Sequence, residues 1–84
     1  MAKQTIIINE LDNVAVALTD LKAGDEHEGV VLREDISKGH KFALKDLKEG
    51  DMVIKYGNPI ARASQRIFAG GHVHPQNART NLSE

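Results

Sequence analysis

Two histidines separated by a single residue, His72 and His74, stand behind the glycine pair 70–71 near the end of this chain. Side chains alternate between the faces of an extended strand, so both imidazoles are expected on one face, with Cβ atoms roughly 6.5–7 Å apart. At that separation the rings could share a metal ion, hold an anionic ligand or supply a general acid. Two solvent-facing histidines without a role are the alternative that the spacing leaves open.

Further polar residues are candidates for the same site. His40 begins a predicted strand, where it could contact a substrate, transfer a proton or simply face solvent. Lys41 would point to the opposite face of an ideal strand, so both residues serve one site only if the turn distorts the alternation. Tyr56, the one tyrosine, precedes Gly57, which permits close approach by a ligand or by another backbone. His27 lies in an acidic turn and is predicted to be solvated.

The segments that would position these side chains read as short strands. Each is rich in β-branched or alternating apolar residues and ends at a turn signal. The predicted strands cover residues 5–8, 14–19, 29–33, 40–44, 52–56, 60–64 and 72–74. Only residues 45–48 could hold a helical turn, because no window keeps a 3.6-residue period for ten positions.

A repeated turn signal separates these strands. An aliphatic residue is followed by two others and then a glycine at residues 21–24, 36–39, 47–50 and 67–70, which we call the four glycine turns. In each turn the aliphatic side chain is expected to enter the core, and the glycine to adopt a positive φ. The spacing of the turns is too irregular for a solenoid and indicates a compact, convoluted β domain.

Composition narrows the class of protein. The 84 residues allow one domain, and a chain this short buries only about 60–65% of its unfolded surface, so docking onto a larger protein would stabilise it. The 11 basic and 12 acidic residues form no basic stripe, which argues against a nucleic-acid or membrane partner. There is no cysteine, and residues 1–8 match neither a signal peptide nor a transmembrane helix, so a cytoplasmic protein is expected.

Four blocks of sequence in this order resemble a known family. They are NELDNVAVAL (9–18), ISKGHKFAL (36–44), GDMVIKYGNPI (50–60) and GGHVH (70–74). Together they resemble the SAF-type domain found at the N-terminus, or as the separate small subunit, of the altronate and galactarate dehydratase family. The small subunit of sulfolactate sulfo-lyase is similar. The resemblance implies a β-clip fold over residues 1–77, followed by a polar tail, 78–84, that is expected to be mobile.

The resemblance also implies a function. The family removes water, or sulfite in the lyase relative, from a polyhydroxy acid. This chain would be the small subunit that completes the active site of a large catalytic subunit, since it is expected to lack a cleft for a sugar acid. A divalent cation, Fe²⁺ or Mn²⁺, would be shared with that subunit. The implied site has His72, His74 and His40 as catalytic residues, Lys41, Tyr56 and Asn77 as substrate contacts, and His72 and His74 as metal ligands.

Two departures from the family pattern keep other functions open. Gln76 stands where the family commonly has a histidine, and Ala61 where it usually has glycine. Glutamine is a poor metal ligand and transfers no proton at neutral pH. A non-catalytic carbohydrate-binding or structural SAF module and a sulfolactate sulfo-lyase subunit are therefore the alternatives. The sequence identifies neither the sugar acid nor the oligomeric state, although exposed edge strands favour association with a partner or a second copy.

Overall fold

The computed structural model describes residues 3–80, which form nine short strands. A central antiparallel sheet has the order β1-β2-β5-β8, with bounds Thr5–Ile6, Val14–Ala17, Lys41–Ala43 and His72–Val73. A separate hairpin comprises β3 (Glu26–His27) and β4 (Val30–Val31), and a third sheet comprises β6 (Met52–Lys55), β7 (Asn58–Ala63) and β9 (Ala78–Arg79). These residues contain no helix, and so no helix that could cross a membrane. The predicted mostly β class is confirmed.

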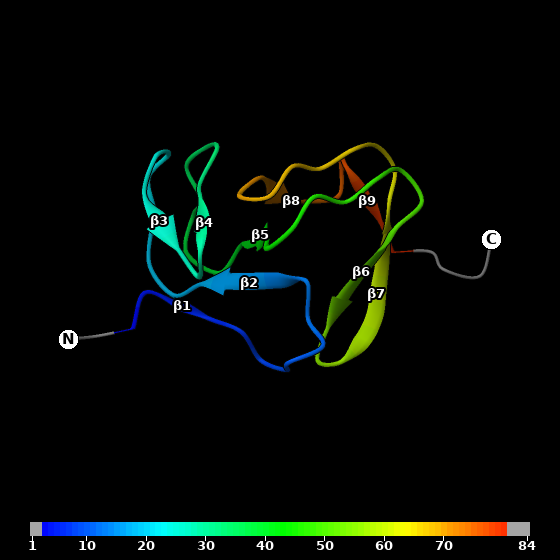
Figure 1. Ribbon diagram of the computed structural model, residues 1–84, viewed down its shortest axis with the longest axis horizontal. Coiled ribbons are helices and arrows are strands. Elements are labelled where there is room, and N and C mark those ends of the chain that lie inside the picture. Colours follow the sequence, from blue (N-terminus) through cyan, green and yellow to red (C-terminus); the bar gives the residue numbers. More distant parts are fainter. Residues whose placement is uncertain (1–2, 81–84) are drawn as a thin grey trace.

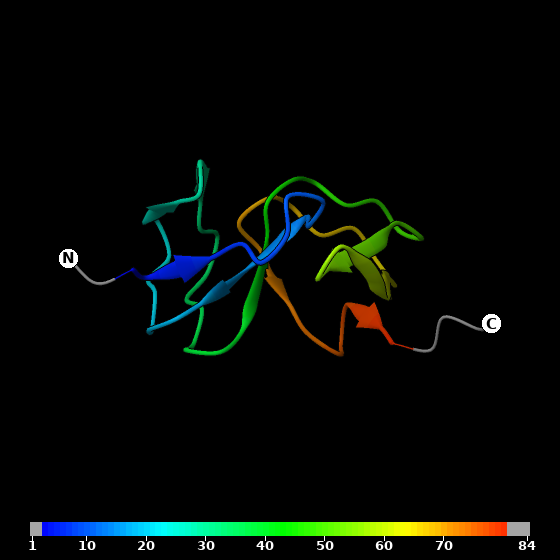
Figure 2. The same ribbon diagram turned by 90° about the horizontal axis from the view of Figure 1, so that it is seen from below.

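The central sheet separates two apolar cores. Successive residues of β2 and β5 point to opposite faces, so Val14 and Ala43 enter one core while Ala15 and Phe42 enter the other. Hairpin β3–β4 and the sheet β6-β7-β9 lie at opposite ends of the molecule (Figures 1 and 2). The core on the hairpin side contains Ala15, Ala17, Leu21, Leu32, Ile36 and Phe42, and the larger core contains Val14, Ala43, Leu47, Val53, Ala61, Ala63, Ile67, Val73 and Ala78.

The four glycine turns have the conformation that their sequence predicts. Their aliphatic residues, Leu21, Ile36, Leu47 and Ile67, are at most 3% exposed. Their glycines, at positions 24, 39, 50 and 70, have φ between +84° and +93°. The residue after each glycine donates its N–H to the carbonyl three positions earlier. A positive φ at the third position of such a turn defines type II, which favours glycine there.

The glycine turns are joined in two pairs. Leu21 and Ile36 exchange backbone hydrogen bonds of 2.8 and 3.0 Å, and Leu47 and Ile67 exchange bonds of 2.8 and 2.9 Å. Aspartates immediately before three of the aliphatic residues strengthen this pairing, because each carboxylate accepts an N–H from the partner turn. The bonds join Ala23 N to Asp35, Lys38 N to Asp20 and Ala69 N to Asp46, at 2.8–2.9 Å.

Several predicted elements differ from the observed ones. The strand expected over residues 5–8 ends at Ile6, and Ile7 and Ile8 are 37% and 42% exposed. The strand β3 was not predicted, because its residues, Glu26 and His27, are neither apolar nor β-branched. Residues 45–48 contain a bend and the bridge at Leu47 in place of a helical turn.

The C-terminal part of the domain extends further than predicted. Ala78 and Arg79 form β9 and pair with Ala63 and Arg62 of β7. The sheet therefore continues past the boundary predicted after residue 77, and Ala78 contributes to the larger core. The remainder of the predicted tail, residues 81–84, lies outside the described residues.

Gly70 differs from the other turn glycines in its surroundings. A Cβ atom at Gly70 would lie 2.1 Å from the carbonyl oxygen of Val31, whereas nothing lies within 4 Å of the corresponding atom at Gly50. The Gly70 amide donates to Ala43 O at 2.8 Å, and its carbonyl accepts from Arg33 N at 3.0 Å. This close approach fixes the start of β8 against the segment that follows β4.

Replacing Gly70 with alanine is expected to be far more damaging than the same change at Gly50. Gly50→Ala adds only the strain of a positive φ, about 1–2 kcal/mol. Gly70→Ala adds the same strain and forces the Val31 backbone to move, so we expect a total loss above about 3 kcal/mol. Urea unfolding followed by circular dichroism measures both losses. Equal midpoints for the two variants would contradict the close packing at Gly70.

Candidate functional site

One hollow of about 290 Å³ gathers most of the polar candidates. It lies between the central sheet and the sheet β6-β7-β9, and no Asp or Glu is among its lining residues, which are Gly39, His40, Lys41, Val53, Ile60, Ala61, His72, Val73, His74, Pro75, Ala78 and Thr80. This volume is just below about 300 Å³, where the range for small-molecule sites begins, so the hollow does not overturn the expectation that the chain lacks a cleft large enough to bury a sugar acid.

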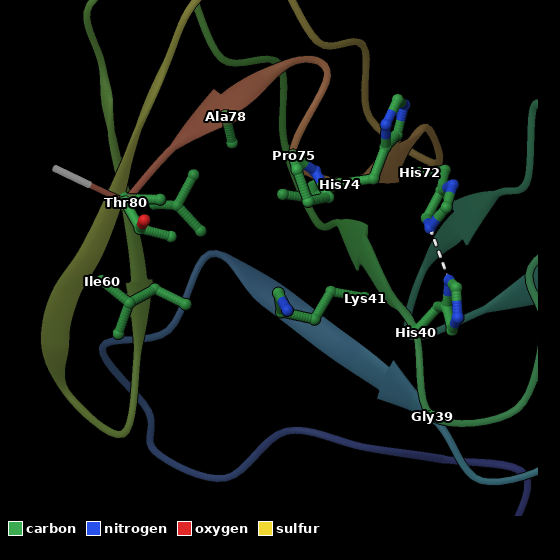
Figure 3. Close-up of a pocket in the computed structure, with 12 residues that line it drawn as sticks. Gly39, His40, Lys41, Ile60, His72, His74, Pro75, Ala78 and Thr80 are labelled. Carbon is green, nitrogen blue, oxygen red and sulfur yellow. Dashed lines mark hydrogen bonds between the residues drawn. The ribbon is translucent and has the colours of Figure 1, made fainter.

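Three histidines form a contiguous cluster at this hollow. His40 Nδ1 and His72 Nε2 are 2.8 Å apart and share a hydrogen bond. The ring centroids of His72 and His74 are 4.6 Å apart, so these two imidazoles lie side by side, as the strand spacing predicts. Figure 3 shows the hydrogen-bonded pair on one side of the hollow, with Lys41 extending toward Ile60 and Thr80.

The pairing of β5 with β8 brings the cluster together. Phe42 lies opposite His72 in the antiparallel register, and Lys41 lies opposite Val73. His40 precedes β5, directly after the turn glycine, and reaches His72 from there. Adjacent residues of an ideal strand point to opposite faces. His40 and Lys41 nevertheless both line the hollow.

Asn77 holds the histidine strand in place. Its side-chain oxygen accepts a hydrogen bond from His74 N at 2.9 Å, and its side-chain nitrogen donates to His72 O at 2.8 Å. The residue is only 7% exposed. Both ends of the amide are thus engaged by the backbone, which differs from the substrate contact predicted for it. Asn77 is a positioning residue in this structure.

Two neighbours of β8 orient the histidines further. The Glu34 carboxylate accepts the His72 N–H at 3.1 Å. The Gln76 N–H donates to His74 Nδ1 at 3.3 Å, so a neutral His74 carries its proton on Nε2 and offers a donor rather than a lone pair there. Sequence reasoning missed Glu34, because nothing in the chain signals that it would meet a strand 38 residues away.

Burial and like charges lower the pKa of two groups in the site, His72 and Lys41. Burial lowers the pKa of His72, and His74, His40 and Lys41 lower it further, while Glu34 acts in the opposite direction. Burial also lowers the pKa of Lys41, with Lys55 lowering it further and Tyr56 partly opposing the shift.

Two other candidate residues lie apart from the cluster. Tyr56 is 57% exposed, is not among the residues that line the hollow, and packs under the Lys55 ammonium at 4.8 Å. The close approach expected at Gly57 is made by the chain itself, since a Cβ there would lie 2.9 Å from the Asn9 side chain. The prediction of a solvated His27 was wrong, because its side chain is only 12% exposed.

The described residues do not form a complete metal site. Within residues 3–80 no group of three or more His, Asp or Glu side chains is arranged to hold an ion. His40 and His72 use facing nitrogens for their mutual bond, and His74 offers an N–H at its free nitrogen. Two imidazoles rarely retain an ion alone. A divalent cation shared with a partner therefore stays a prediction, and it would draw most of its ligands from that partner.

NMR titration can test the effect of each neighbour on the pKa of His72. We expect a pKa below that of an ordinary histidine, because burial is the largest contribution. Replacing the neighbouring imidazole in His74→Gln should raise it, and replacing the carboxylate in Glu34→Gln should lower it. A shift in the opposite direction in either variant would contradict the arrangement described above.

The role of Asn77 can be tested by its effect on stability. Asn77→Ala leaves the His72 carbonyl and the His74 amide without their partner, so we expect a loss of about 2 kcal/mol in the free energy of unfolding. Gln76→Ala is the matched control, because that side chain is exposed, and should cost less than about 0.5 kcal/mol. Chemical unfolding measures both, and similar losses would refute the role assigned to Asn77.

Comparisons with known proteins match the sequence of this chain to a family. The family model described as the altronate/galactarate dehydratase SAF domain matches residues 3–81. The chain is 55% identical to an altronate dehydratase of Escherichia coli and 43% identical to one of Bacillus subtilis, over 96% and 98% of its length, and spans 17% of each. It is 34% identical to the (2R)-sulfolactate sulfo-lyase subunit alpha of Chromohalobacter salexigens, over 88% of this chain and 92% of that one. The chain is a member of the SAF domain family of altronate and galactarate dehydratases.

Proposed function

We propose that this chain is the small subunit of a hydro-lyase that removes water from a sugar acid, and that it completes the active site of a large catalytic subunit. The observation that carries the proposal is the cluster of His40, His72 and His74 beside Lys41, around a hollow whose lining contains no Asp or Glu. Such a lining favours an anionic ligand, since its ionisable groups are either neutral or positive.

Dehydration of a hydroxy acid suits these groups. The reaction removes a proton beside a carboxylate and delivers a proton to the departing hydroxyl group. Lys41 supplies a charge that can pair with the substrate carboxylate, and the Nε2–H of a neutral His74 can hydrogen-bond to the hydroxyl. The proton delivered to the hydroxyl would come from an imidazole of the cluster in its protonated form, which is left neutral. The partner subunit would supply the remaining groups and enclose the substrate, because the hollow is small and this chain offers no carboxylate base within it.

A separate small subunit is supported by the size of one relative. The sulfolactate sulfo-lyase subunit alpha of Chromohalobacter salexigens is 92% covered by this chain, so a whole subunit of that enzyme corresponds to this module. The altronate dehydratases carry the module as a 17% segment of a longer chain. A large partner in either arrangement would present its catalytic face to the histidine cluster. The proposal also includes association of this chain with a second copy of itself in the complex with the large subunit.

A non-catalytic module is the second candidate, and Gln76 is the residue that favours it. Gln76 is exposed and contributes only its backbone N–H to the site, at His74 Nδ1. Without a proton-transferring group at this position, the chain could bind a carbohydrate or hold a partner in place without taking part in the reaction. If the chain is catalytic, replacing the histidines of the cluster lowers kcat/KM. If it is a non-catalytic module, the same replacements leave kcat/KM unchanged.

Grafting this chain into a longer relative separates the candidates. The chain would replace the matching 17% of the Escherichia coli altronate dehydratase, and release of the keto acid from altronate would be measured. We expect an active chimera in which His72→Gln and His74→Gln each reduce kcat/KM by at least about a hundredfold, as expected for lost proton transfer.

The control for the graft is His27→Gln, which removes the one histidine outside the cluster and should leave kcat/KM within a fewfold. Circular dichroism and the oligomeric state establish that each variant is folded. Full activity in the two cluster variants would support the non-catalytic module instead. Release of sulfite from sulfolactate, with no water lost from altronate, would identify the sulfo-lyase function.

A further inference from the structure

Phe68 is an aromatic residue at a turn position that is polar in the other three glycine turns. In each turn, the residue after the buried aliphatic one accepts, at its carbonyl, the hydrogen bond that closes the turn. This residue is exposed in all four turns, and it is Lys22, Ser37, Lys48 or Phe68. Phe68 is 43% exposed and belongs to neither apolar core. Folding of the turn therefore needs no aromatic side chain at this position.

Two arginines hold their guanidinium groups over the ring of Phe68. The guanidinium carbon lies 4.5 Å from the ring centroid in Arg33 and 5.2 Å from it in Arg66. Both arginines are exposed, and the attraction between a cation and an aromatic face restrains them there. Arg33 also donates its backbone N–H to Gly70 O at 3.0 Å, which fixes its segment beside the turn. We call Arg33, Arg66 and Phe68 the Arg–Phe patch.

The charges of the Arg–Phe patch are not neutralised by nearby acidic groups. Within residues 3–80, neither guanidinium group lies within 4 Å of a carboxylate oxygen. The two acidic residues that follow Arg33 are engaged elsewhere, because Glu34 accepts the N–H of His72 and Asp35 that of Ala23. Among the described residues, the patch thus combines two positive charges without a counterion and an exposed apolar ring.

We propose that the Arg–Phe patch is a docking surface for a protein segment in which carboxylates flank an apolar side chain. The carboxylates match the planar fork of each guanidinium group, and the apolar side chain covers the exposed ring. Arginine and aromatic residues are also the types that are enriched at the centre of protein interfaces. Because the stacked guanidinium groups are already oriented, docking costs less side-chain entropy than it would with free arginines.

The charge of the patch selects a different protein as its occupant over a second copy of this chain. A twofold axis through the patch would bring the guanidinium groups of both copies together, and these like charges repel. In the complex proposed above, the large subunit carries the acidic segment. For the identity of that protein, the inference rests on the proposed function.

The patch adjoins the strand that carries the histidine cluster. Phe68 lies four residues before His72 in the chain. Glu34, which follows Arg33, accepts the backbone N–H of His72 at 3.1 Å. A protein segment bound to the patch is therefore held next to β8.

An NMR titration of the isotope-labelled chain tests the patch with a defined probe. The probe is a peptide with capped ends, Gly-Glu-Leu-Leu-Asp-Gly, and its match carries Gln and Asn in place of the two acidic residues. We expect the acidic peptide to shift the amide signals of residues 33 and 66–69 and to bind at least about tenfold more tightly than its match. Its affinity should fall as salt is added, because the contacts are exposed.

Two serine variants at equivalent turn positions separate binding from folding. Phe68→Ser should weaken peptide binding at least about tenfold, because the ring is lost and the arginines are no longer restrained. Lys48→Ser is the matched control and should leave binding unchanged. Both variants should keep the fold, since Ser37 occupies the same position in another glycine turn. Circular dichroism checks the fold of each variant.

Several results would overturn the docking surface. They are the absence of binding by the acidic peptide, equal binding of the two peptides, and binding that survives Phe68→Ser. Patch signals that shift with protein concentration alone would show a second copy as the occupant and would also overturn it. An active chimera combined with any of these results removes the docking surface and keeps the proposed function. Peptide binding at the patch together with cluster variants that retain full activity does the reverse.

Discussion

The histidine cluster depends on the backbone bridge between Leu47 and Ile67. This bridge places Ile67 in the larger core, and three residues later Gly70 lies against the carbonyl of Val31. The chain that enters β8 is thereby held from both ends of the molecule. Only one register with β5 satisfies both contacts. A slip of one residue would move both imidazoles to the opposite face, since side chains alternate along a strand.

The site brings together basic groups only, three imidazoles and one ammonium group, in a domain with small hydrophobic cores. Gathering three imidazoles and an ammonium group would be costly if all were charged. The cost is low here because the histidines can stay neutral, and their mutual bond requires one bare nitrogen. Lys41 keeps partial access to solvent, and Glu34 approaches from outside the lining of the hollow.

Sequence reasoning located the turns and most strands because their signals are local. A glycine after a fixed interval predicts a type II turn, and apolar runs that contain β-branched residues, such as Val14–Ala17, predict strands. The strands β3 and β9 contain no β-branched residue, so they carry no such signal and were missed. The two adjacent imidazoles of His72 and His74 followed from strand geometry alone.

Contacts between distant segments could not be predicted in the same way. His40 and His72 are 32 residues apart, and their hydrogen bond depends on how β5 and β8 align. Lys41 joins the hollow only because the third sheet closes over that side of the strand. Asn77 was recognised as part of the site, but its two backbone bonds become visible only in three dimensions.

The side chains of Asn77 and Glu34 also protect an edge of the central sheet. β8 is the last strand of that sheet, and a bare edge strand invites pairing with another chain. Here the N–H and C=O of His72 and the N–H of His74 are already bonded to those two side chains. A protein that docks here cannot extend the sheet by backbone pairing unless it displaces them. Recognition at this edge must therefore use side chains, which leaves the imidazoles free to face whatever is bound.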